Sequence, residues 1–157
     1  MKRLLIVGAG GHGKVVAEMA KACGYTVAFL DDKAGDGVVG TLEDVKTIAS
    51  QYDGAIISLG NNKKRQELMS QISNPVTLVH PRAYVSPSAI IGEGSIILPG
   101  AVVHTNAKIG RGCIISIGAL IDHDSQIGDY CHINTGAIVG AGAKVVCGTR
   151  VSAGTVV

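Results

Sequence analysis

The amino-acid sequence predicts an α/β domain followed by a parallel β-helix. Isoleucine or valine recurs at every sixth residue from Val79 to Val157, and a small residue stands four places after each of them up to Val151. The residues before this repeat alternate between short apolar strands and segments of helical periodicity. We therefore expect the α/β domain to span residues 1–75 and the β-helix to span residues 76–157.

The six-residue period fits neither an α-helix nor a simple alternating strand. It fits a solenoid in which each hexad supplies one flat side and one corner. The branched residue is expected to point into the core, and the small residue is expected to fill the crowded corner. Because the chain stops at the first residue of a hexad, we expect the solenoid to be incomplete at its C-terminal end.

The first 75 residues read as alternating strands and helices. A buried strand over residues 4–7 leads into a glycine-rich turn and then a helix over residues 14–23. The later expected elements are a strand at 26–30, a helix at 41–51 opened by a capping box, a strand at 55–59, a helix at 63–72 capped by Asn61 or Asn62, and a strand at 76–79. This order predicts a small parallel sheet with half-Rossmann-like topology.

The glycine-rich turn has the pattern G-x-G-x-x-G, formed by Gly8, Gly10 and Gly13 between a strand and a helix. Backbone N–H groups at a helix start bind phosphate oxygens. Asp31 and Asp32 follow about twenty residues later, where nucleotide-binding βαβ units carry an acid. A nicotinamide cofactor needs two mononucleotide halves and this domain supplies one, so we expect a single nucleotide. Purely structural glycines are the alternative.

Composition and charge narrow the classes of partner. The chain has 14 Lys and Arg against 12 Asp and Glu, and aromatic residues make up only 3%, so a nucleic-acid partner is not expected. No apolar run approaches the roughly 20 residues of a spanning helix, and no signal peptide is recognised, so we expect no membrane and a cytoplasmic location. Cys113 and Cys131 both fall at the small inward position and are expected to be core thiols.

Histidine is the natural proton acceptor near neutral pH, and His123 is the strongest candidate for a general base. Its place in the hexad predicts an exposed corner position. The neighbouring Asp124 can orient the imidazole ring and stabilise its charged form. His104 is expected to lie one coil away from Asp122 as a structural pair. A solvated corner histidine without a chemical role is the alternative for His123.

Five motifs resemble one branch of the left-handed β-helix acyltransferases, the hexapeptide-repeat family. They occupy residues 8–13, 29–32, 60–65, 85–89 and 121–124. The branch is the PglD/NeuD-type sugar acetyltransferases. The resemblance implies a left-handed coil of three hexads, a homotrimer, and acetyl transfer from acetyl-CoA to the amine of a nucleotide-linked 4-amino sugar, with UDP as the expected nucleotide.

The resemblance also implies roles for individual residues. His123 corresponds to the catalytic base and Asp124 to its orienting acid, although relatives often have glutamate at this place. The expected acetyl-CoA contacts are His132, Gly140 and Ala141. The expected nucleotide-sugar contacts are Gly10, Gly11, His12, Asp31, Asp32 and Gly60. Independently of the resemblance, we expect backbone amides near Gly136, Gly140 and Gly142 to hold the thioester oxygen.

Other functions remain open. The closest enzymatic alternative is O-acetylation of sialic acid or another sugar, and a non-catalytic nucleotide-sugar-binding protein is a third possibility. A γ-type carbonic anhydrase shares the β-helix and binds zinc through histidines. Its His-x4-His pair is absent, because His123 and His132 are nine residues apart, so we expect no metal site.

Overall fold

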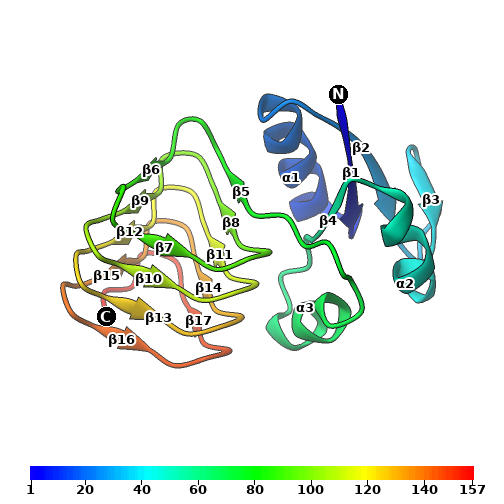
Figure 1. Cartoon of the computed structure of the whole chain (residues 1–157). Helices are drawn as coiled ribbons and strands as arrows, with labels where there is room; N and C mark the ends of the chain where they lie inside the picture. Colours follow the sequence, from blue (N-terminus) through cyan, green and yellow to red (C-terminus); the bar gives the residue numbers. More distant parts are fainter. The chain divides into compact units, whose positions relative to one another are not determined.

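The computed structural model describes all 157 residues of the chain. The chain divides into two compact units, Met1–Val76 and Thr77–Val157. Figure 1 labels their helices and strands. None of the helices combines the length and the apolar character that crossing a membrane requires.

The first unit is built on a four-stranded parallel sheet in the order β3-β2-β1-β4. The central strand β1 buries Leu4, Leu5, Ile6 and Val7 completely, which explains its uninterrupted apolar run. The elements are β1 (Lys2–Val7), α1 (Gly11–Ala22), β2 (Tyr25–Leu30), β3 (Val38–Gly40), α2 (Val45–Ile48), β4 (Gly54–Ile57) and α3 (Asn62–Met69).

Two parts of this unit differ from the prediction. Strand β3 was not predicted, because it has only three residues and follows a glycine-rich loop with Gly37 at φ +73°. The helix predicted over residues 41–51 is divided into a 3₁₀ turn (Leu42–Asp44), the short α2, and a second 3₁₀ turn (Ala49–Gln51). The predicted capping interaction is present, since the Asp44 carboxylate accepts a hydrogen bond from the Thr41 N–H at 2.8 Å.

The ends of the last predicted elements also shift. Asn61 caps α3 by accepting a hydrogen bond from the Lys64 N–H at 2.9 Å, but the helix ends at Met69 instead of residue 72. The strand expected at 76–79 is split. Val76 N–H donates to the Ala55 carbonyl in the first unit at 2.9 Å. The β-helix strand proper begins only at Leu78.

The second unit is a parallel β-helix of two-residue strands arranged in three sheets (Figure 1). Strands pair with those eighteen residues away, as Ile109 does with Ile91 and Ile127, so the expected coil of three hexads is confirmed. The first sheet contains β7 (Ile90–Ile91), β10 (Lys108–Ile109), β13 (Gln126–Ile127) and β16 (Lys144–Val145). The second contains β5 (Leu78–Val79), β8 (Ile96–Ile97), β11 (Ile114–Ile115), β14 (His132–Ile133) and β17 (Arg150–Val151). The third contains β6 (Tyr84–Val85), β9 (Val102–Val103), β12 (Leu120–Ile121) and β15 (Ile138–Val139).

The core of the β-helix follows the hexad pattern. Branched residues such as Ile97 and Ile115 are completely buried, and the small residues at the corners pack between them. Cys113 and Cys131 are buried core thiols, as predicted. The Cys113 thiol donates a hydrogen bond to the Gly128 carbonyl at 3.1 Å, so the small corner residues also satisfy backbone acceptors of the next coil.

The corners share one unusual backbone conformation. The fourth residue of most hexads has a positive φ, and it is glycine in eight of them: Gly94, Gly100, Gly112, Gly118, Gly136, Gly142, Gly148 and Gly154. Three corners carry a side chain at this place, on Asn106, Asp124 and Tyr130, with φ of 58°, 60° and 55°. Asn106 and Asp124 lie eighteen residues apart and therefore occupy one column along the β-helix.

Candidate functional site

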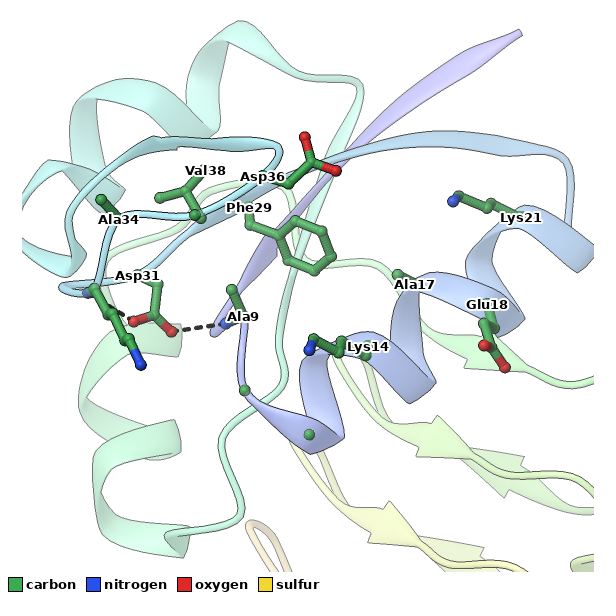
Figure 2. Close-up of a pocket in the computed structure, with 14 residues that line it drawn as sticks. Ala9, Lys14, Ala17, Glu18, Lys21, Phe29, Asp31, Ala34, Asp36 and Val38 are labelled. Carbon is green, nitrogen blue, oxygen red and sulfur yellow. Dashed lines mark hydrogen bonds between the residues drawn. The ribbon is translucent and has the colours of Figure 1, made fainter.

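The first unit contains a cavity of about 730 Å³ next to the glycine-rich turn. Figure 2 shows the Phe29 ring lying between α1 and the loop that follows β2. The lining carries three positive charges, on Lys14, Lys21 and Lys33, and three negative charges, on Glu18, Asp31 and Asp36. Such a cavity combines an aromatic face with cations suited to phosphate.

The glycines of the turn fall into two groups. Gly8 has φ +113°, and a Cβ at Gly13 would collide with the Gly8 carbonyl, so the close packing of β1 against α1 requires both glycines. A Cβ at Gly10, Gly11 or Gly60 would meet no atom within 4 Å. The fold therefore does not require these three glycines. Their missing side chains leave the adjacent backbone open to a ligand.

The start of α1 offers free donors. Its N-cap residue, Gly10, makes no side-chain capping hydrogen bond. The first hydrogen bond of the helix ladder is that of Lys14, whose N–H donates to the Gly10 carbonyl at 3.0 Å. The amides of the first turn and the positive end of the helix dipole therefore face outward beside the cavity, an arrangement that favours an anion.

The two acidic residues at the end of β2 order the neighbouring loops. Asp31 accepts hydrogen bonds from the Ala9 N–H at 2.8 Å and the Lys33 N–H at 2.9 Å (Figure 2). These bonds, the one from Ala9 foremost, lower the pKa of the Asp31 carboxyl below its ordinary value. Asp32 accepts from the Leu42 N–H at 3.1 Å. Asp31 lines the cavity and Asp32 does not.

His12 and Gly60 lie outside the residues that line this cavity. Burial lowers the pKa of the His12 imidazole below its ordinary value, and the positive charge of Arg65 lowers it further. Its Nε2 atom is buried without a hydrogen bond. Arg65 is only 1% exposed and donates to the Leu59 carbonyl at 2.9 Å, which holds the turn that carries Gly60.

The second candidate site lies at one corner of the β-helix. His123 Nδ1 is 2.8 Å from Asp124 Oδ2, and the two side chains are 52% and 57% exposed. This hydrogen bond is the largest cause of the raised pKa of His123, and it likewise lowers the pKa of Asp124. When neutral His123 donates its Nδ1 proton to Asp124, Nε2 is left as the acceptor. The predicted exposed histidine–carboxylate pair is present.

Two further features lie next to this pair, the His104 side chain and a surface groove. The His104 ring centroid lies 6.4 Å from that of His123. His104 Nδ1 is 4.0 Å from Asp122 Oδ1, so the predicted pairing across one coil exists, although both side chains are about half exposed and the contact is long. A groove of about 500 Å³ adjoins Asp124. Its lining residues are Ser88, Ile90, Asn106, Lys108, Asp124 and Gln126.

The residues predicted to contact acetyl-CoA occupy different environments. His132 is 9% exposed, and its Nε2 lies 3.1 Å from the Ser116 hydroxyl. Gly140 and Ala141 lie one coil beyond Asp122 and His123 at the same corner. The structure contains no group of three or more His, Cys, Asp or Glu residues arranged to hold a metal ion.

Three of the expected oxyanion donors already have partners in the fold. The N–H groups of Gly136, Gly140 and Gly142 donate to the carbonyls of Ile117, Val157 and His123 at 3.0, 2.8 and 3.0 Å. These amides link successive coils and are already paired. These three amides therefore do not hold the thioester oxygen, because coil stacking uses the same donors. For the amides next to them, the expectation stays a prediction.

Known families match both units of the chain. The PglD N-terminal domain matches residues 3–72, and the bacterial transferase hexapeptide (six repeats) matches residues 88–123. The entire chain superposes with a TM-score of 0.89 on the acetyltransferase domain of PglB from Neisseria gonorrhoeae FA1090, at 33% identity and covering 91% of that chain. The chain belongs to the PglD-type sugar acetyltransferases of the hexapeptide-repeat family. The predicted family and fold class, including the left-handed β-helix, are confirmed.

Two further proteins are similar to this chain over different shares of their length. A mutant of perosamine N-acetyltransferase from Caulobacter crescentus, in complex with CoA and GDP-perosamine, superposes on the whole chain with a TM-score of 0.86 at 32% identity, covering 89% of that protein. UDP-N-acetylbacillosamine N-acetyltransferase from Bacillus subtilis (strain 168) is 37% identical over an alignment of 112 positions, which covers 62% of this chain and 52% of the relative. The match thus spans about half of that curated relative.

Several side chains at these sites of the PglD-type chain were not identified from the sequence. Lys14, Lys33 and Asp36 line the cavity of the first unit. Lys14 follows the glycine pattern directly, which is a usable signal for a phosphate partner. Asn106 donates to Asp124 Oδ1 at 3.3 Å. The signal for Asn106 was the replacement of glycine at the fourth place of its hexad.

Replacing Asp124 with asparagine should lower the pKa of His123 toward its ordinary value of about 6.5, because the hydrogen-bonded carboxylate stabilises the imidazolium. NMR titration of the His123 ring protons measures this change. Asp129→Asn is the matched control, since Asp129 accepts from the Arg111 N–H at a different corner. An unchanged His123 pKa in Asp124→Asn would show that the pair does not form in solution.

Proposed function

We propose that this protein transfers the acetyl group of acetyl-CoA to the amine of a UDP-linked 4-amino sugar. The observation that carries the proposal is the His123–Asp124 hydrogen bond at an exposed corner of a PglD-type β-helix. The relatives support the reaction class. One relative is named a UDP-N-acetylbacillosamine N-acetyltransferase. The acetyltransferase domain of PglB binds acetyl-CoA, and perosamine N-acetyltransferase binds CoA together with GDP-perosamine.

The chemistry assigned to His123 is proton removal. The sugar amine attacks the thioester carbon of acetyl-CoA, an amide bond forms, and the bond to the CoA sulfur breaks. The attacking nitrogen must lose a proton, which neutral His123 accepts at Nε2. The Asp124 carboxylate stabilises the resulting imidazolium, and the raised pKa of His123 makes it a stronger base. The departing thiolate takes up a proton to give CoA.

The first unit is proposed to hold the nucleotide. The open backbone at Gly10 and Gly11, the amides at the start of α1 and the Lys14 ammonium group suit the pyrophosphate. The Phe29 ring offers an aromatic face to the base. Asp31 supports this arrangement by fixing the Ala9 amide. For His12, Asp32 and Gly60, the nucleotide-sugar contacts remain predictions from the resemblance.

Acetyl-CoA is proposed to bind at the corner that carries His123. Gly140 and Ala141 lie one coil beyond Asp122 and His123 and present only small side chains there, which leaves room for the pantetheine arm. His132, with its ring fixed by the Ser116 hydroxyl, is the remaining proposed contact. We also propose a cytoplasmic location, where acetyl-CoA and nucleotide sugars are available.

A homotrimer is proposed for the assembled enzyme. The outward side chains of the third sheet form an apolar column, in which Tyr84 is 52% exposed and Leu120 is 42% exposed. Ile138 and Val156 continue the column on the following coils. Exposed apolar columns of this kind are typical of protein–protein contacts. The resemblance to trimeric acetyltransferases supports three copies.

Leu120→Glu should dissociate the trimer, because a buried, unpaired carboxylate at the interface costs more than the contact contributes. Sedimentation velocity of the purified chain and the variant measures the change. Lys144→Glu is the matched control, because Lys144 is an exposed outward residue of the first sheet. Equal sedimentation of wild type and Leu120→Glu would exclude the third sheet as the interface.

Gly10→Ala should weaken UDP binding about tenfold, roughly 1–2 kcal/mol, because the added methyl group meets the phosphate and no protein atom. Isothermal titration calorimetry measures the affinity, and thermal unfolding should be unchanged. Gly13→Ala is the contrasting variant and should destabilise the unit by about 1–3 kcal/mol, because its Cβ collides with the Gly8 carbonyl. Wild-type UDP affinity in Gly10→Ala would refute the proposed phosphate site.

His123→Ala should lower kcat by about a hundredfold or more, the usual contribution of a general base, with little change in the KM for acetyl-CoA. Release of the CoA thiol, followed with a UDP-4-amino-4,6-dideoxy sugar as acceptor, measures the rate. His104→Ala is the control, because His104 lies beside His123 without the bond to Asp124. Turnover that persists in the His123→Ala variant would show that His123 is not the general base.

A further inference from the structure

Asn106 occupies a backbone conformation that most corners of the β-helix reserve for glycine. Its φ is 58°, and that of Asp124, one coil later in the same column, is 60°. Asparagine and aspartate enter this region at moderate cost, and side chains retained in strained conformations cluster at functional sites. Gly142 stands at the equivalent place one coil beyond Asp124, so the backbone of this corner does not require a side chain.

The side chain of Asn106 connects two coils through Asp124. Asn106 Nδ2 donates to Asp124 Oδ1 at 3.3 Å, and Asp124 Oδ2 faces His123 Nδ1 at 2.8 Å. The two carboxylate oxygens thus have different partners. Because a carboxylate rotates freely about its last bond, a donor on one oxygen restricts the direction of the other.

Asn106 is itself held in place from the preceding coil. The Ser88 hydroxyl accepts a hydrogen bond from the Asn106 N–H at 3.0 Å, and it contacts the Ser86 hydroxyl at 3.1 Å. The Asp124 N–H in turn donates to the Thr105 carbonyl at 2.9 Å. A continuous series of hydrogen bonds therefore runs along the corner from Ser86 to His123.

We propose that Asn106 is a positioning residue that holds the Asp124 carboxylate in the orientation in which it bonds to His123. This inference rests on the proposed function of His123 as the general base. Asn106 contacts neither His123 nor the reacting atoms. It acts through Asp124, and it fixes the tautomer of neutral His123 in which Nε2 accepts the proton.

The charged and titratable groups that face His123 are Asp124, Asp122 and His104. Asp124 contributes most to the raised pKa of His123, through its hydrogen bond. Loss of the Asn106 amide has two opposite effects on that pKa. A carboxylate that turns away lowers it, whereas a carboxylate that stays in place and loses a donor on its other oxygen leaves it equal or higher.

The test is Asn106→Gly, which supplies the residue that other corners use at this place and keeps the backbone conformation. The expected results are a His123 pKa shifted toward its ordinary value and a mixture of His123 tautomers, both read by NMR of the ring nitrogens and protons. In turnover, kcat should fall about tenfold with the KM for acetyl-CoA unchanged, because part of the general-base contribution is lost.

Tyr130→Gly is the matched control. Tyr130 also has a positive φ at the fourth place of its hexad, at 55°, but at a different corner, so the variant makes the same backbone change away from His123. In the Tyr130→Gly variant, the His123 pKa, the His123 tautomer and the kcat of the enzyme should equal those of the wild type. A His123 pKa and tautomer in Asn106→Gly that match the wild type, or a pKa that rises, would overturn the inference.

The NMR measurements of the His123 pKa and tautomer test the role of Asn106 separately from the proposed reaction. They report the orientation of Asp124 whether or not the protein turns over the UDP-sugar. If wild type shows no turnover, or His123→Ala retains it, the proposed reaction fails while the His123 pKa and tautomer still decide the role of Asn106. If His123→Ala is inactive and Asn106→Gly behaves as wild type in every measurement, only the role of Asn106 fails.

Discussion

Hydrogen bonding between successive coils is the constraint on which the β-helix depends. Each short strand pairs in register with the strands eighteen residues before and after it, so equivalent places of the hexads form columns along the axis. This register brings Asn106 and Asp124 together although they lie on different coils. It also uses up the backbone amides of Gly136, Gly140 and Gly142. Those three amides are therefore not available to a substrate.

The α/β unit is governed by a different constraint, the close approach of β1 and α1. Gly8 and Gly13 are required for that packing, whereas the free space at Gly10 and Gly11 has no role in the fold. The same short pattern thus carries structural and binding glycines side by side. The hydrogen bond from the Ala9 N–H to Asp31 joins the turn to the end of β2, so the acidic residue serves the site by ordering its loop.

The six-residue period was sufficient to predict a solenoid, because a period of six has few structural solutions and because core places accept only branched or small residues. The coil of three hexads was predicted from the resemblance. The exposed position of His123 followed from the same period. Strand β3 was missed because three residues after a glycine-rich loop carry little pattern, and its pairing with β2 is a tertiary contact. The occupied amide of Gly142 was also beyond the sequence, since its partner is a carbonyl of another coil, that of His123.

The most direct test of amine acetylation is the mass and chemical stability of the product. The protein is incubated with acetyl-CoA and a UDP-4-amino-4,6-dideoxy sugar, and the nucleotide sugar is examined by mass spectrometry before and after treatment with hydroxylamine, which cleaves esters and leaves amides intact. Acetyl transfer to the amine predicts the gain of one acetyl group that survives the treatment. An unchanged mass, or an acetyl group that hydroxylamine removes, would contradict it.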